Sequence, residues 1–132
     1  MAADSVFTKI IKGEILAQII AEDDRFMAFL DVFPLQKGHT LVIPKTQIDY
    51  IFDLEDDVLA ELMVFAKKVA PAIKKATSCK RVGVTVIGLE VPHAHIHLIP
   101  INQMDDMNFS NPKKKFPAEE MAAIADQIKA NL

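Results

Sequence analysis

The sequence predicts an α+β domain, in which a five-stranded antiparallel sheet packs against one main helix and shorter helices lie near both ends of the chain. Three observations support this. Short apolar runs separated by polar turn residues fill the first third, an apolar stripe with helical spacing follows from Leu54 to Ile73, and two β-branched runs come between positions 82 and 99. A chain of 132 residues is long enough for one core and too short for two, so we expect a single domain over 1–132.

The N-terminal part predicts a short helix and then three strands. Ser5 stands where an N-cap would precede apolar residues, and Gly13 stands where a helix would stop. The polar cluster Glu22-Asp23-Asp24 separates two apolar runs and predicts a hairpin turn, while Pro44 ends the run after it. The three strands are expected over 17–21, 25–30 and 40–43.

The main helix is predicted from the apolar stripe, whose members recur at steps of three and four residues. Asp53 is available as its N-cap, and acidic residues in the first turn suit the helix dipole. Pro71 lies inside the pattern. Because proline lacks an N–H and its ring collides with the preceding turn, we expect it to kink the helix or end it early.

The C-terminal part predicts two more strands, over 82–87 and 94–99, and then an irregular polar loop over 101–115. Pro117 opens a last amphipathic helix that carries Met121, Ile124 and Ile128. The loop contains three consecutive basic residues, Lys113 to Lys115. Such a run is most often a solvated segment, and an anion site is the alternative.

Composition excludes several classes of protein. Fifteen basic and eighteen acidic side chains give a net charge of −3, so we expect no binding of nucleic acid or of an anionic membrane, and any phosphate must be bound locally. The single Cys79 cannot form an internal disulfide, and the N-terminus lacks the pattern of a signal peptide. No apolar stretch approaches the roughly 20 residues that cross a bilayer. These features predict a cytoplasmic protein.

Three of the four histidines alternate along one predicted strand, as His93, His95 and His97. Residues two apart on a strand share a face, which would set successive imidazoles roughly 6.5 to 7 Å apart. The residues between and after them, Ala94, Ile96 and Leu98, would then face the core. Three interpretations are open: surface histidines on a solvated face, ligands of a zinc or iron ion, or groups that perform phosphoryl chemistry as nucleophile and proton donor.

Two segments resemble the signatures of a known family. They are Lys37-Gly38-His39-Thr40-Leu41-Val42-Ile43-Pro44-Lys45 and His93-Ala94-His95-Ile96-His97-Leu98, supported by Phe7-Thr8-Lys9-Ile10-Ile11-Lys12-Gly13-Glu14-Ile15 and Phe29-Leu30-Asp31. In order and spacing they are similar to the histidine-triad (HIT) family, in its Hint-like nucleotide hydrolase branch. The resemblance implies a HIT-like fold with a core over about 5–100 and a tail over 101–132.

The resemblance also implies roles for individual residues. His95 matches the nucleophile that forms a nucleotidyl-histidine intermediate, His97 and His39 match the histidines that bind the phosphate and the leaving-group side, and His93 matches the one that organises the others. Asp31 matches the acceptor of a ribose hydroxyl. The apolar slot for the purine is matched by Phe7, Ile10, Ile15, Phe29 and Val32, for which an ordinary core role is the alternative. The family also implies a homodimer, paired through the main helix and a neighbouring strand.

The sequence departs from the family at two places. Where the family often has Gly-Gln-Ser or Gly-Gln-Thr before the triad, this chain has Gly88-Leu89-Glu90. A carboxylate near a phosphate is repulsive, so Glu90 is expected to alter substrate choice or rate, and one hypothesis is that it recognises a cationic leaving group. Some relatives bind structural zinc through two cysteines near the N-terminus, where this chain has Ser5 and Thr8. We therefore predict no metal and no cofactor.

These features predict a hydrolase or nucleotidyl transferase that cleaves nucleoside 5'-phosphoramidates or related nucleotide conjugates at the α-phosphate. Three alternatives remain. One is a dinucleoside polyphosphate hydrolase. Another is a non-catalytic nucleotide-binding protein, in which Leu89 and Glu90 have weakened the chemistry. The third is a metal-dependent hydrolase.

Overall fold

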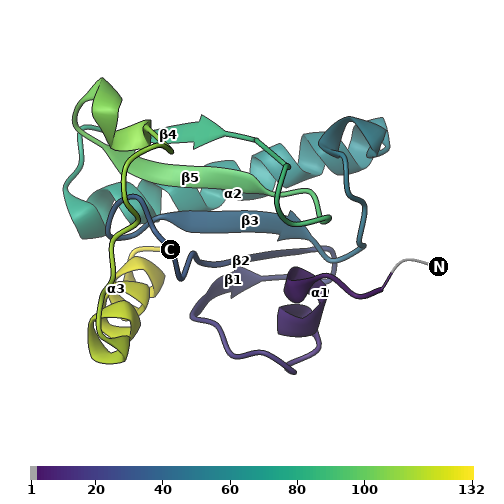
Figure 1. The fold of residues 1–132 in the computed structure, drawn as a ribbon, viewed down its shortest axis with the longest axis horizontal. Coiled ribbons are helices and arrows are strands. Elements are labelled where there is room, and N and C mark those ends of the chain that lie inside the picture. The colour runs from purple at the N-terminus through teal and green to yellow at the C-terminus, as the bar shows by residue number, and fades with distance from the viewer. Residues whose placement is uncertain (1–2) are drawn as a thin grey trace.

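The computed structural model describes residues 3–132, which form a five-stranded sheet with helices on both of its faces (Figure 1). The strands are β1 (Ile19–Glu22), β2 (Phe26–Leu30), β3 (Thr40–Pro44), β4 (Arg81–Thr85) and β5 (Ile96–Ile101). The α-helices are α1 (Val6–Ile11), α2 (Asp56–Thr77) and α3 (Ala118–Ala130), and short 3-10 turns cover Ile51–Asp53 and Met104–Met107. The strand order is β1-β2-β3-β5-β4 and each neighbouring pair is antiparallel, which confirms the predicted fold class.

The larger core lies between one sheet face and the helices α2 and α3, and Figure 1 shows α2 running behind the sheet. Helix α2 buries an amphipathic stripe that includes Leu62, Val69 and Ile73, in agreement with the predicted periodicity. Helix α3 adds Ile124 and Ile128 to the same core. The C-terminal segment therefore packs on the sheet.

A smaller core lies on the opposite face, under α1. Phe7 and Ile10 of α1 pack against Phe29 of β2 and Leu41 of β3. Both faces of β2 and β3 are therefore covered, and every residue of these two strands is buried. The helix begins as the sequence predicts, because the Ser5 side chain accepts a hydrogen bond from the Thr8 N–H.

Of the two effects expected of Pro71, an early end of the main helix is wrong, because α2 continues to Thr77, and a kink stays a prediction. Proline leaves the carbonyl of Lys67 without its helical partner. Both residues are exposed, so water can hydrogen-bond that carbonyl at little cost. The start of α2 also differs from the prediction, since Asp53 ends a 3-10 turn and Glu55 is the N-cap.

The strand that was expected over 94–99 begins later, at Ile96, and ends at Ile101. Consequently only His97 of the three alternating histidines belongs to a regular strand. The segment after β5 contains the Met104–Met107 turn and is otherwise irregular up to α3, much as predicted. Within residues 3–132, no helix combines the length and the apolar character needed to cross a membrane.

Candidate active site

Four histidines meet where β3 and β5 pair at the centre of the sheet. His39 precedes β3, His97 lies in β5 opposite Leu41, and His93 and His95 lie in the irregular segment before β5. All four side chains are buried, so they are not the surface histidines of a solvated face. The His95 and His97 rings have centroids 4.9 Å apart, closer than strand spacing predicted, because the chain bends before β5.

His95 is held in one tautomer by a backbone carbonyl. Its Nδ1 lies 2.7 Å from the backbone oxygen of His93. A carbonyl oxygen can only accept, so Nδ1 carries the proton and the lone pair of the neutral ring is on Nε2. The edge of Phe7 packs against this ring, with centroids 5.0 Å apart. This is the arrangement that a nucleophilic imidazole requires.

His39 and His97 form a chain of hydrogen bonds with a fixed direction. The Leu35 N–H donates to His39 Nδ1 at 3.0 Å, so the neutral His39 ring carries its proton on Nε2. That Nε2 donates to His97 Nδ1 at 3.0 Å, which places the His97 proton on Nε2. His97 can therefore present an N–H to an acceptor.

Burial keeps these two histidines neutral. It lowers the pKa of His39 to about 3, assisted by the nearby charge of Lys113. It also lowers the pKa of His97 to about 3, assisted by His39 and His95. Near pH 7 the pair can donate hydrogen bonds but supplies no full positive charge.

His93 anchors the triad to distant parts of the chain. Its Nε2 donates to the backbone oxygen of Pro44 at 2.8 Å, which leaves Nδ1 to accept from the Ser5 hydroxyl at 2.8 Å. Thr8 and Ser5 both bind Gln47 as well. The first triad histidine thus ties the N-cap of α1 to the end of β3, and burial lowers its pKa.

A slot of about 450 Å³ opens beside His95 and His97. All eight residues that the sequence predicted to bind substrate line it: Phe7, Ile10, Ile15, Phe29, Asp31, Val32, Leu89 and Glu90. Phe7, Ile10 and Phe29 are buried in the smaller core and also form a wall of the slot. A core role is therefore confirmed for these three residues, and purine binding stays a prediction. Ile15, Val32 and Leu89 are exposed. His39 and His93 do not line the slot, and each is hydrogen-bonded behind it.

Asp31 lies beside the histidine chain, with Oδ2 3.6 Å from His39 Nε2. Donor atoms of Asp31, His39 and His97 lie within 4.8 Å of one another, a spacing that could suit a metal ion. The hydrogen bonds argue against this. His39 could bind a cation through Nε2 only with its proton on Nδ1, which would face the Leu35 N–H donor. The absence of a metal stays a prediction.

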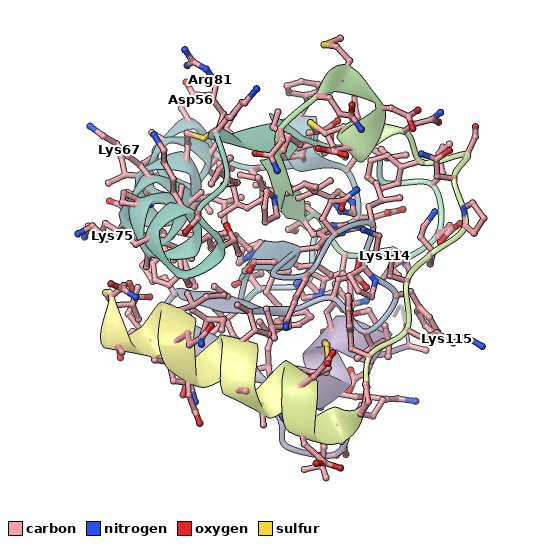
Figure 2. The ribbon with its side chains drawn as sticks, turned by 90° about the vertical axis from the view of Figure 1, so that its left-hand side faces the viewer. Asp56, Lys67, Lys75, Arg81, Lys114 and Lys115 are labelled. Atoms are coloured by element: carbon pink, nitrogen blue, oxygen red, sulfur yellow. The ribbon has the colours of Figure 1, made fainter. Side chains whose placement is uncertain are left out.

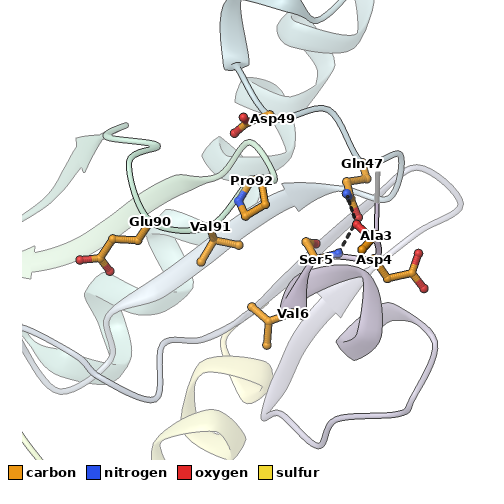
Figure 3. Close-up of a pocket in the computed structure, with 9 residues that line it drawn as sticks. All are labelled: Ala3, Asp4, Ser5, Val6, Gln47, Asp49, Glu90, Val91 and Pro92. Carbon is orange, nitrogen blue, oxygen red and sulfur yellow. Dashed lines mark hydrogen bonds between the residues drawn. The ribbon is translucent and has the colours of Figure 1, made fainter. Parts of the chain in front are cut away.

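Glu90 lies between the slot and a second, more open hollow of about 560 Å³ (Figure 3). The second hollow is lined by Ala3, Asp4, Ser5, Val6, Gln47, Asp49, Glu90, Val91 and Pro92. Figure 3 shows the Glu90 carboxylate pointing away from Ser5 and Gln47. Three carboxylates and no lysine or arginine line this hollow among residues 3–132, although Lys12 pairs with one of the carboxylates, that of Asp4. A cationic group would favour this charge pattern.

Phe109 has no role predicted from the sequence, yet it lies beside the histidines. Its ring lies against His97 at a centroid distance of 5.1 Å and near His39 at 6.3 Å. Phe109 and Lys113 both line the slot, although they belong to the polar loop after β5. A basic run was the signal for Lys113, but no local pattern distinguishes Phe109 from other loop residues.

Comparisons with known proteins agree with this arrangement. The HIT domain family model matches residues 12–104. An uncharacterised HIT-like protein of Borreliella burgdorferi is 33% identical over 137 residues, covering 98% of this chain and 99% of the relative. The adenosine 5'-monophosphoramidase of Schizosaccharomyces pombe is 32% identical over 129 residues, covering 96% and 97%.

Solved structures show the same fold. The crystal structure of a Hit-like protein from Bartonella henselae matches with a TM-score of 0.85 and 32% identity, and the match covers 100% of both chains. The family model spans most of the sheet and both signature segments, and the relatives extend over nearly the whole chain. The chain therefore belongs to the HIT, or histidine triad, family, which includes nucleotide-binding hydrolases.

Proposed function

We propose that this protein hydrolyses nucleoside 5'-phosphoramidates or related nucleotide conjugates at the α-phosphate, through a nucleotidyl intermediate on His95. One observation carries the proposal. His95 has an unprotonated Nε2 at the wall of an apolar slot, and His97 beside it has a protonated Nε2. A nucleophile and a hydrogen-bond donor are thus side by side where a nucleotide fits.

The geometry supports a two-step reaction. His95 Nε2 forms a bond to phosphorus, and the bond from phosphorus to the leaving nitrogen breaks with its electron pair on that nitrogen. The leaving nitrogen takes the Nε2 proton of His97. The negative charge that this leaves on the His97 ring is offset by the positive charge that the attack creates on the neighbouring His95 ring. Water then attacks phosphorus and gives one proton to His97. The bond from phosphorus to His95 Nε2 breaks with its electron pair on that nitrogen, which releases the nucleoside monophosphate and restores the His95 ring.

The first test is the rate of AMP release from an adenosine phosphoramidate in the presence of a chelator. His95→Ala is expected to abolish release, because the other histidine among the described residues that line the slot, His97, has its unprotonated Nδ1 occupied by His39. Mass spectrometry of the unaltered protein, quenched during turnover, is expected to find a nucleotidyl group on His95. AMP binding without any release would instead favour the non-catalytic nucleotide-binding protein.

The same assay compares the remaining enzymatic alternatives. Dinucleoside polyphosphates, used as substrates in place of phosphoramidates, test the alternative that the protein hydrolyses phosphoanhydride bonds. Metal dependence is tested by the chelator itself, since a metal-dependent hydrolase would lose activity in it. We expect the phosphoramidate to be cleaved fastest and the chelator to have no effect.

We also propose that Glu90 recognises a cationic leaving group, such as a lysine-like amine. Its position between the slot and the acidic hollow supports this, because a group leaving from a phosphate in the slot can extend past Glu90. Glu90→Gln should then reduce activity on conjugates with a charged amine more than on the unsubstituted phosphoramidate. An equal loss on both substrates would contradict the assignment.

We further propose a homodimer formed through α2 and β4. β4 is an edge strand with Val84 half-exposed, and α2 next to it exposes the apolar side chains of Met63 and Val64. Unpaired strand edges and exposed apolar side chains are features that association covers. A cytoplasmic location stays a prediction, supported by the free and buried Cys79.

A further inference from the structure

The slot has an unbalanced charge for a site that holds a phosphate. Asp31 and Glu90 bring two carboxylates to its lining. The buried His39 and His97 stay neutral near pH 7 and add no positive charge. Glu90 and Leu89 also stand where the family pattern has a hydroxyl and an amide. An anionic nucleotide therefore needs a cation from another part of the chain.

Lys113 is the one lysine or arginine among the described residues that line the slot. Its ammonium group donates to the backbone oxygen of Phe109 at 2.9 Å and lies 5.5 Å from the centroid of the Phe109 ring. Phe109 in turn packs against His97. An ammonium group has three protons, so Lys113 keeps donor capacity for a ligand after its contacts within the loop.

The loop that carries Lys113 is attached to the segment just before His39. The Lys114 N–H donates to the backbone oxygen of Pro34 at 2.8 Å, and the Lys114 ammonium donates to Gln36 Oε1 at 2.8 Å. Gln36 also donates to the backbone oxygen of Asp106. These contacts place Lys113 at the slot, whereas Lys115 points away from the molecule (Figure 2).

We propose that Lys113 binds the anionic phosphate of the nucleotide, and so supplies the contact that Leu89 and Glu90 no longer provide. This assignment rests on the proposed function, since it names a phosphate-binding residue of the same slot. It also explains how a slot with two carboxylates can accept a nucleotide. Lys113 is thus a substrate-binding residue contributed by the loop after β5.

The test compares the binding of AMP with that of adenosine, which lacks the phosphate, by titration calorimetry at low salt. Lys113→Ala is expected to weaken AMP binding about tenfold, or about 1.4 kcal/mol, and to change adenosine binding by less than about twofold. Lys113→Arg keeps the charge and should retain most of the AMP affinity. Lys115→Ala removes the same charge from the same loop and is the matched control, expected to bind both ligands normally.

Added salt provides a second readout. AMP binding by the unaltered protein should weaken as salt rises, and Lys113→Ala should reduce that dependence. Equal weakening of AMP and adenosine binding by Lys113→Ala would show that the residue only supports the slot wall, and would overturn the inference. Unchanged AMP binding would overturn it too, while leaving the proposed function intact. Failure of the unaltered protein to bind AMP would overturn both.

Discussion

Mild acid should destabilise this protein through its buried histidines. In the folded state the pKa of His39 and of His97 is lowered from 6.5 to about 3, chiefly by burial. Between these values the unfolded chain binds protons that the folded protein cannot bind. The free energy of unfolding is therefore highest above pH 6.5 and falls as the pH falls toward 3.

The size of the effect follows from the two shifts. At pH 5 each of these histidines costs about 2 kcal/mol of stability relative to pH 7.5, or about 4 kcal/mol for both. The lowered pKa of His93 acts in the same direction. The pKa of Asp23 and of Asp106 is also lowered, so these carboxylates stay charged above pH 5 and add nothing in this range.

The assay is urea unfolding followed by circular dichroism at pH 7.5 and pH 5, at one fixed protein concentration because association would change apparent stability. His39→Asn is the informative variant, since a side-chain oxygen can still accept from Leu35 while one buried imidazole is gone. Its loss of stability between the two pH values should be about 2 kcal/mol smaller than that of the unaltered protein. An unaltered protein that loses less than about 1 kcal/mol, or a variant with an undiminished loss, would refute the reasoning.

Three further predictions concern single substitutions. Gly38→Ala should lower the free energy of unfolding by about 1–3 kcal/mol in urea unfolding, because Gly38 has φ +96° and a Cβ there would lie 2.8 Å from the Thr77 methyl group. Unchanged stability would contradict this prediction. Ser5→Ala should lower the free energy of unfolding by about 1–2 kcal/mol and slow phosphoramidate turnover, because it removes the cap of α1 and the hydrogen-bond donor to His93. Normal stability together with normal turnover would contradict the role of Ser5 in holding His93. Val64→Asp should convert the dimer to a monomer, measured by light scattering, without loss of helix content, because it places a charge on the exposed apolar face of α2. An unaltered protein that is already a monomer would contradict the proposed interface.

Much of the fold could be predicted because its signals are local. The cap at Ser5 and the stripe along α2 depend on residues within one or two turns of helix, and both are present as predicted. The predictions were wrong where the surroundings of a residue in the folded protein outweighed its local preference. Pro71 is tolerated because its lost hydrogen bond faces solvent, and β5 starts two residues late because the chain before it bends so that His93 and His95 reach different partners.

The candidate site also combines features that the sequence predicts with features that only the folded structure decides. By itself the sequence predicted ten of the residues that line the slot, His95, His97 and eight others, because the spacing of the signature segments can be read along the chain. Only the tertiary structure decided which ring nitrogen of each histidine carries the proton, and that Phe109 and Lys113 reach the slot. The reason is physical: the partners that fix the tautomers of His93 and His97 are the Pro44 carbonyl and His39 Nε2, which lie far away in the sequence and become neighbours only when the chain folds.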